Sequence, residues 1–125
     1  PVDLAMAEGA LAEMIRHSSR LVRLPDIEKA ICGTFGLEPS SLQSTRKTKG
    51  VSQPRMLAMW LARKYTRAAL SEIGHYFGRR SHSTVVSAQK RVEDWLAAGT
   101  SLQMASRTWR IDDAIHQIEQ SLLAG

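Results

Sequence analysis

The stretch from Ser52 to Val92, SQPRMLAMWLARKYTRAALSEIGHYFGRRSHSTVVSAQKRV, contains the pattern that decides the fold. Its apolar residues recur at spacings of three and four, which is typical of helices. Gly78 can end one helix, and Ser81 is a residue type that caps the start of the next. The stretch therefore predicts a short helix at 70–77, a turn at 78–81 and a longer helix at 82–97, which together form a helix-turn-helix.

Short hydrogen-bonding side chains, from Ser81 to Thr84, open the second helix directly after Arg79 and Arg80. In a helix-turn-helix this first turn faces base edges in the major groove of DNA. The alternative is that Ser81 only caps the helix and that His82 is a solvated side chain, which is the commoner outcome for an isolated S-H-S-T run. The adjacent arginines, the glycine turn and the short preceding helix favour base contact here.

Helical periodicity continues on both sides of this stretch, so we expect an all-α fold, a small helical bundle. At 125 residues the chain can bury one core. Residues 1–20 are expected to form an N-terminal helix, starting at Asp3, that acts as a linker or docks on the bundle. Residues 21–125 are expected to form one helix-turn-helix DNA-binding domain.

Three further helices are expected within this domain. One begins at Pro25 and stops at Gly36, and a second begins at Pro54 after an exposed basic loop, because proline suits the first turn of a helix. The last runs from about Ser106 to Leu123, with an inward stripe of Ile111, Ile115, Ile118 and Leu122.

Positive charge is concentrated in the middle of the chain. The formal net charge is +5 at pH 7, but the window from Ser44 to Arg91 holds 11 basic residues and a single acidic one, Glu72. The flanks hold the other 6 basic and 11 acidic residues. The middle should therefore form a cationic surface whose natural partner is a polyanion such as nucleic acid.

Composition and motifs argue against other classes of protein. The single cysteine, Cys32, excludes an internal disulfide and a cysteine-rich zinc site, and a reducing cytoplasm is the simplest compartment. The longest apolar run, Met56 to Ala62, is too short to span a bilayer. The sequence has no G-x-x-x-x-G-K-[ST] phosphate loop, and Asp112 with His116 supplies only two candidate metal ligands. We therefore expect no catalytic, cofactor or metal site in this chain, and any ATPase domain would lie in a longer parent protein.

The same region resembles a known family. The segments IEKAICGTFGLEPSSL at 27–42, PRMLAMWLAR at 54–63 and LSEIG at 70–74 are followed by GRRSHSTV at 78–85, which is similar to the family signature G-G-R-D-H-T-T-V. In this order, over about Leu24 to Val92, they resemble the C-terminal DNA-binding domain, domain IV, of the bacterial replication initiator DnaA. The ordered set is much more specific than any one segment.

The resemblance implies a two-groove reader of duplex DNA carrying DnaA-box-like sites. It implies base contacts by Lys47 in the minor groove and, in the major groove, by Arg55, Leu70, Ser71, Ser81, His82, Ser83, Thr84 and Ala88. It implies phosphate contacts, which fix register without reading sequence, by Arg46, Lys49, Arg79, Arg80, Lys90 and Arg91. The implied setting is the bacterial nucleoid in the cytoplasm, with other copies of the parent protein on arrayed sites.

Four positions depart from the family pattern. Ser81 and Ser83 stand where the family has aspartate and threonine, Met56 stands where glutamine is common, and Lys47 stands where arginine is usual. A hydroxyl accepts from a cytosine amino group more weakly than a carboxylate does, and lysine lacks the planar fork of arginine. We expect DNA binding with an altered or relaxed sequence preference.

Two alternatives to an initiator domain remain open at this point. One is a DnaA-like helix-turn-helix in a transposase-related protein or a transcription regulator. The other is a basic helical module that binds an acidic protein or structured RNA. The basic turn between a short and a long helix favours DNA over the second alternative.

Overall fold

Eight elements follow one another in the computed structural model, which describes residues 22–38, 40–43, 49–78, 80–104 and 107–124. They are helix α2 (Leu24–Phe35), the 3-10 turn η1 (Ser41–Gln43), helices α3 (Lys49–Tyr65), α4 (Leu70–Tyr76) and α5 (His82–Ala98), strands β1 (Ser101–Met104) and β2 (Arg107–Arg110), and helix α6 (Ile111–Ala124). The predicted helical bundle is confirmed. The helix expected within residues 1–20 lies outside the described residues.

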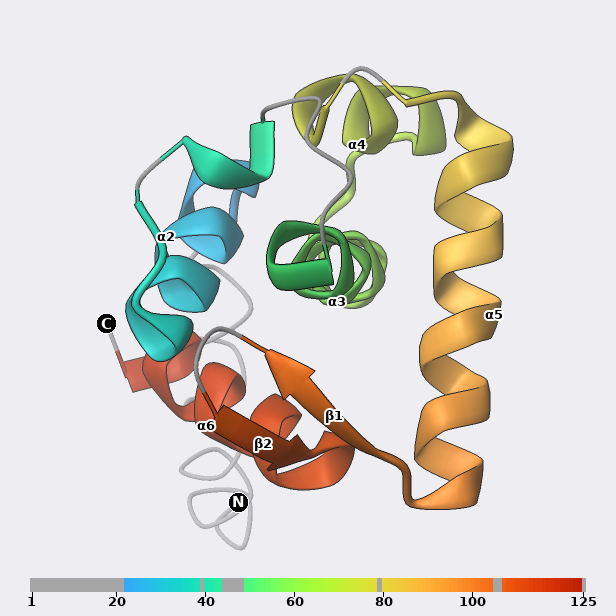
Figure 1. Cartoon of the computed structure of the whole chain (residues 1–125). Coiled ribbons are helices and arrows are strands. Elements are labelled where there is room, and N and C mark those ends of the chain that lie inside the picture. Colours follow the sequence, from blue (N-terminus) through green and yellow to red (C-terminus); the bar gives the residue numbers. More distant parts are fainter. Residues whose placement is uncertain (1–21, 39, 44–48, 79, 105–106, 125) are drawn as a thin grey trace, which may run out of the picture.

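Helix α3 occupies the centre of the fold. Figure 1 shows it nearly end-on, with α2, α4, α5 and α6 arranged around it. Its Leu57, Ala58, Leu61 and Ala62 are completely buried. Small and branched apolar side chains along one broad side of the helix let neighbouring helices pack closely, and this burial is the main source of stability. Helix α3 therefore serves as the platform on which the other elements are placed.

Two of the predicted helix boundaries agree with the structure within a residue. The short helix expected at 70–77 is α4, and the longer one expected at 82–97 is α5. Gly36 follows α2 with φ of 68°, the left-handed conformation that glycine adopts without strain. The apolar stripe expected on the last helix is also confirmed, since Ile111, Ile115, Ile118 and Leu122 are all buried.

The start of α3 was predicted wrongly. The helix begins at Lys49, and Pro54 lies inside it rather than in its first turn. Proline removes one donor from the helix ladder, but the preceding turn still forms because Val51 packs into the core with only 7% of its surface exposed. Residues 49–52, which were expected in the basic loop, are therefore helical.

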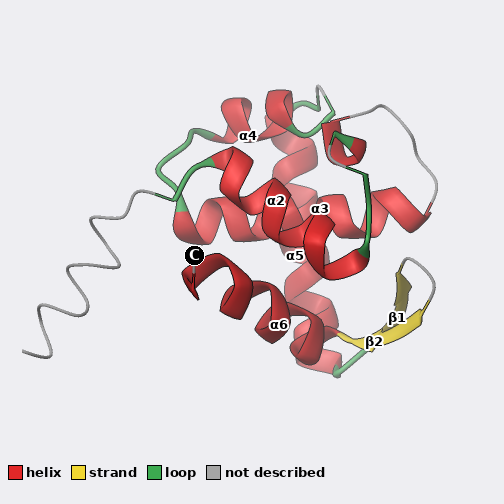
Figure 2. Cartoon of the chain, turned by 90° about the vertical axis from the view of Figure 1, so that its left-hand side faces the viewer, coloured by secondary structure: helices red, strands yellow, loops and turns green. Residues whose placement is uncertain are grey.

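The segment before α6 was also predicted wrongly, because residues 107–110 form a strand rather than the start of the last helix. Strands β1 and β2 pair antiparallel, with Leu102 opposite Trp109. Apolar and polar residues alternate along β1, which is the two-residue period of a strand, and Trp109 favours strands as well. Figures 1 and 2 both place this hairpin at the opposite end of the molecule from α4.

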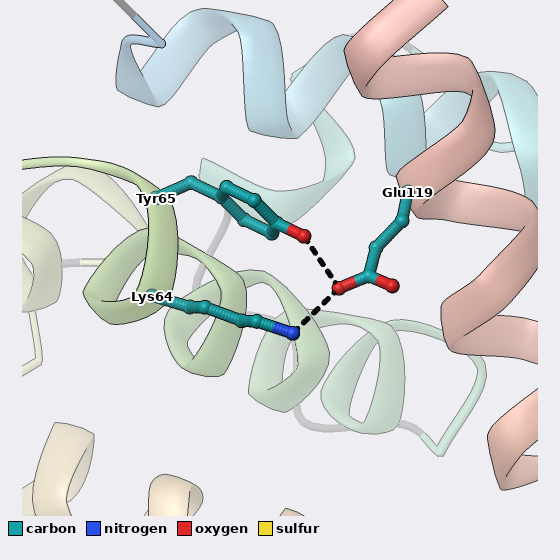
Figure 3. A network of polar contacts seen from close by, with 3 residues as sticks. All are labelled: Lys64, Tyr65 and Glu119. Atoms are coloured by element: carbon teal, nitrogen blue, oxygen red, sulfur yellow. Dashed lines mark hydrogen bonds and ion pairs between the residues drawn. The ribbon is translucent and has the colours of Figure 1, made fainter. Parts of the chain in front are cut away.

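A polar network fastens α6 to the end of α3 (Figure 3). Lys64 Nζ lies 2.8 Å from Glu119 Oε2, and the hydroxyl of Tyr65 donates to the same oxygen at 2.7 Å. Burial alone would raise the pKa of Glu119, but the hydrogen bonds from Lys64 and Tyr65 outweigh it and lower that pKa. The ionised carboxylate therefore stabilises the contact between the two helices.

None of the described helices combines the length and the apolarity that a membrane-spanning helix requires.

The helix-turn-helix depends on a close backbone approach at Gly74. The amide of Arg80 donates to the carbonyl of Gly74 at 2.7 Å, which brings the turn onto α4. A Cβ atom on residue 74 would lie 2.3 Å from the carbonyl oxygen of Arg80, which is far inside van der Waals contact. The sequence must therefore have glycine at this position, and Gly78, with φ of 97°, completes the turn.

Replacing Gly74 by alanine should lower the free energy of unfolding by about 1–3 kcal/mol, because the added methyl group must push the turn away from α4. Urea unfolding of the two proteins measures the difference. Gly33→Ala is the matched control, since a Cβ there meets nothing within 4 Å. In the last turn of α2 that change should instead stabilise by about 0.5–1 kcal/mol. Equal effects of the two substitutions would contradict the close approach.

Glu119→Gln should lower the free energy of unfolding by about 1 kcal/mol at neutral pH, because it removes the charge that Lys64 and Tyr65 contact. The folded-state pKa of Glu119 is lowered, so the stabilisation is present above the ordinary glutamate pKa and is lost as the pH falls through the folded-state value. Urea unfolding of both proteins across this pH range should show the difference closing. The exposed Glu93 offers the control Glu93→Gln, and a gap that persists in acid would contradict this role of Glu119.

Candidate nucleic-acid interface

The first turn of α5 is exposed while the opposite face of the helix is buried. Val85 and Val92 have no exposed surface, and Ala88 is 4% exposed, so these residues fix α5 against the rest of the bundle. Helix α5 packs mainly on α3 and α4. The residues from Ser81 to Thr84 are exposed at the end of α5 that adjoins α4. The helix therefore presents its polar first turn outward on a rigid support.

Three hydroxyl groups form a network at this first turn. The hydroxyl of Ser81 accepts from the backbone amide of Thr84 at 3.4 Å, which caps the helix. The same oxygen lies 2.9 Å from the hydroxyl of Ser83 and 3.1 Å from that of Thr84. In each of these two contacts either oxygen can be the donor. Ser81 thus both caps α5 and remains exposed to solvent.

A groove of about 280 Å³ lies between α3 and α5. It opens beside the first turn of α5 and combines short polar side chains with three guanidinium groups and an apolar floor. Its lining comprises Ser52, Arg55, Met56, Met59, Arg80, Thr84, Ser87, Ala88 and Arg91. This groove brings together, from two helices and the turn, residues that are far apart in the sequence.

Arg55 lies at the buried side of this groove, with only 4% of its surface exposed. Its Nε donates to the carbonyl of Leu42 in η1 at 3.0 Å. Burial, and then the positive charge of Arg80, lower the pKa of the Arg55 guanidinium from its ordinary value. Because an arginine side chain stays protonated in proteins, the groove holds two neighbouring positive charges, which an anion placed between them would stabilise.

Of the remaining predicted contact residues, some lie on α4 and α5 outside the lining of this groove. Leu70, which is half-buried, and Ser71, which is exposed, begin α4. Lys90 and Arg91 are exposed on α5. The structure thus brings Arg55, Arg80, Thr84, Ala88 and Arg91 into one groove, with Ser81, His82 and Ser83 exposed next to it. The predicted contacts Arg46, Lys47 and Arg79 lie outside the described residues, as does the side chain of Lys49 at the start of α3.

Sequence reasoning missed Ser52 and Ser87, which also line the groove. A signal for both was present. Ser87 lies three residues after Thr84 and Ser52 lies three residues before Arg55, so each shares a helix face with a predicted contact residue. Among the described residues, no group of three or more side chains could hold a metal ion, and Asp112 pairs with Arg110 at 3.2 Å.

Comparison with known proteins identifies the domain type. The family model described as the bacterial DnaA protein helix-turn-helix matches residues 24–92, which is more than half of the chain. The chain is 38% identical over 101 residues to the chromosomal replication initiator protein DnaA of Sphingopyxis alaskensis, covering 81% of this chain and 22% of that protein.

Two further relatives have the same name. Identity is 36% over 103 residues to the protein of Rhodopseudomonas palustris strain BisB18, covering 82% of this chain and 22% of that protein. It is also 36% over 97 residues to the protein of Chlorobaculum tepidum, covering 78% and 20%. The chain spans only about a fifth of the length of these relatives. It belongs to the bacterial DnaA helix-turn-helix family, as a C-terminal DnaA domain.

Proposed function

We propose that this domain binds double-stranded DNA at DnaA-box-like sites and that it does so in the initiation of chromosome replication. The observation that carries the proposal is the exposed polar first turn of α5 beside a groove lined by Arg55, Arg80 and Arg91. A helix-turn-helix uses that turn to reach base edges in the major groove, and cations beside it to contact phosphates. The resemblance of the chain to initiator proteins supports the biological setting.

In this proposal the contact residues fall into two groups. Bases would be read by Lys47 in the minor groove and by Arg55, Leu70, Ser71, Ser81, His82, Ser83, Thr84 and Ala88 in the major groove. Phosphates would be contacted by Arg46, Lys49, Arg79, Arg80, Lys90 and Arg91. The first group should set sequence preference, and the second should set affinity for any duplex. The domain would then work at the nucleoid, next to other copies of its parent protein on neighbouring sites.

The hydroxyl network predicts how selective the first turn can be. A hydroxyl can accept from an amino group or donate to a carbonyl, so Ser81, Ser83 and Thr84 can adapt to more than one base. An aspartate at position 81 would accept only. We therefore propose that this domain tolerates substitutions in its DNA site at the bases that face these hydroxyls.

Titration of the domain against a DnaA-box duplex, a scrambled duplex and a hairpin RNA at several salt concentrations tests the proposal. The box duplex should bind most tightly. If the six phosphate-contact residues each neutralise one phosphate, log Kobs should fall with log salt with a slope of about −5. Equal affinity for the box and scrambled duplexes would rule out specific reading, and a slope near zero would rule out phosphate contacts. Preference for the RNA would favour the structured-RNA alternative.

His82→Ala should reduce the ratio of box to scrambled affinity by about 5- to 150-fold, because a lost base contact removes about 1–3 kcal/mol of discrimination. Competition binding at fixed salt measures the ratio. His116→Ala on α6 makes the same chemical change at an exposed site away from the groove and should leave the ratio unchanged. An unchanged ratio in His82→Ala would mean that α5 is not the recognition helix.

Arg91→Ala should weaken binding to all duplexes by the same factor and make the salt slope shallower by about one, because a phosphate contact carries no sequence information. Arg110→Ala removes the same charge from the hairpin at the opposite end of the molecule and should have little effect. Affinity as a function of salt for both variants measures the difference. A change confined to the box duplex would instead assign Arg91 to base reading.

A further inference from the structure

One carboxylate connects three elements next to the proposed interface. The hydroxyl of Tyr76 in α4 donates to Glu28 Oε1 in α2 at 2.8 Å. The side-chain amide of Gln43 in η1 donates to the two oxygens of the same carboxylate at 3.0 and 2.8 Å. Glu28 therefore joins α2, η1 and α4 through side chains that are 15 to 48 residues apart in the sequence.

The turn η1 has a second anchor on α3. Nε of Arg55 donates to the carbonyl of Leu42, whose side chain is completely buried. Residues 42 and 43 are thus held from α2, α3 and α4 together. A turn that only connected two helices would not need hydrogen bonds to side chains from several helices.

The turn η1 directly precedes the basic segment in the sequence. Gln43 is followed directly by residues 44–48, which include Arg46 and Lys47. Tyr76 is in the helix whose Gly74 carbonyl holds the turn before α5. Burial, and then the hydrogen bond to Glu28, raise the pKa of the Tyr76 phenol, so it remains a proton donor at any pH at which the domain is handled. The network thus connects the start of the basic segment to the helix-turn-helix.

We propose that Glu28, Gln43 and Tyr76 are positioning residues that hold η1 against α4, so that the basic segment after Gln43 and the recognition helix engage DNA as one unit. This inference rests on the proposed function, because it requires both parts to contact the same duplex. The positioning residues touch no DNA themselves. They hold η1 in one place, so the position of Gln43 need not be ordered on binding.

A double-mutant cycle tests the proposal. Tyr76→Phe removes only the hydroxyl and keeps the edge-to-face contact with Phe77, whose ring centroid lies 4.9 Å away. It should weaken binding to a DnaA-box duplex by about three- to tenfold, because the hydroxyl donates to Glu28 at 2.8 Å and accepts from Gln43 at 3.4 Å, and both hydrogen bonds are lost. In a Lys47→Ala background the same change should cost less than twofold, because the positioned segment no longer makes its main contact.

Tyr65→Phe is the matched control. It removes a phenol that donates to a glutamate in the same way, at 2.7 Å from Glu119, but at the contact of α3 with α6. It should alter stability without altering the affinity for the box duplex. A loss of affinity equal to that of Tyr76→Phe would overturn the inference, because it would show that any such loss acts through stability alone.

Glu28 provides a rescue by a conservative variant. Glu28→Gln retains an oxygen that can accept from Tyr76, and rotation of the Gln43 amide can restore the second contact. It should therefore bind the box duplex within about twofold of wild type, whereas Glu28→Ala should lose as much affinity as Tyr76→Phe. Equal losses in the two Glu28 variants would overturn the role of the hydrogen bonds.

The anchor can also be observed without DNA. The NMR signals of the Gln43 side-chain amide in the free domain should shift in Tyr76→Phe and stay in place in Tyr65→Phe. Unshifted signals in Tyr76→Phe would overturn the inference.

The affinities of the wild-type protein for the box and scrambled duplexes show which of the two proposals has failed. Equal affinity of wild type for box and scrambled duplexes overturns the proposed function and, with it, this inference. A wild type that discriminates, together with equal effects of Tyr76→Phe with and without Lys47, overturns the inference alone.

Discussion

The hydrogen bond from the Arg80 amide to the Gly74 carbonyl is the contact on which the proposed reading surface depends. At 2.7 Å it brings the turn so close to α4 that only glycine fits at position 74. Because the turn is fixed, α5 leaves it in one direction, and Val85 and Val92 meet the buried surface of the bundle. This backbone hydrogen bond would not itself contact DNA. It determines the orientation of α5 and therefore which face of that helix is exposed.

The groove between α3 and α5 follows from the same constraint. Arg55 comes from α3 and Arg91 from α5, and they line one groove because these two helices pack against each other. Positive charges placed on separate rigid supports cannot relax away from one another. Burial first, and then the positive charge of Arg80, lower the pKa of Arg55, and an anion in the groove would offset the repulsion between these two arginines. Packing of the core thus keeps Arg55, Arg80 and Arg91 around one groove, an arrangement that favours binding of a phosphate.

The parts of the fold that were predictable are those that depend on local sequence. Gly78 and Ser81 mark a helix end and a helix start whatever surrounds them, so α4 and α5 were placed within a residue. The start of α3 was missed because burial of Val51, a tertiary effect, outweighs the preference of Pro54 for a first turn. The hairpin was missed because each strand has only four residues. An alternation of polar and apolar residues over so short a stretch does not distinguish a strand from an irregular connection between helices.

The candidate site also has a part that was predictable from local sequence and a part that was not. The exposed residues at the start of α5 were predictable from the motif, because a cap and a first turn are local features. The groove was not, since the approach of Arg55 to Arg80 and the bond from Arg55 to Leu42 join segments that no periodicity relates. The network of Glu28, Gln43 and Tyr76 is invisible in the sequence for the same reason.

The hydroxyl network at the start of α5 limits what its members can contribute to the proposed recognition. The hydroxyl of Ser81 is already satisfied by the amide of Thr84 and by neighbouring hydroxyls, so a base contact would exchange one hydrogen bond for another. An exchange of neutral hydrogen bonds yields about 0.5–1.5 kcal/mol at most. Under the proposed function, any strong discrimination would then come from side chains without such partners and from DNA shape read by the cations. In this domain Ser81 would chiefly hold the helix start in place, and His82 beside it would carry more of the sequence reading.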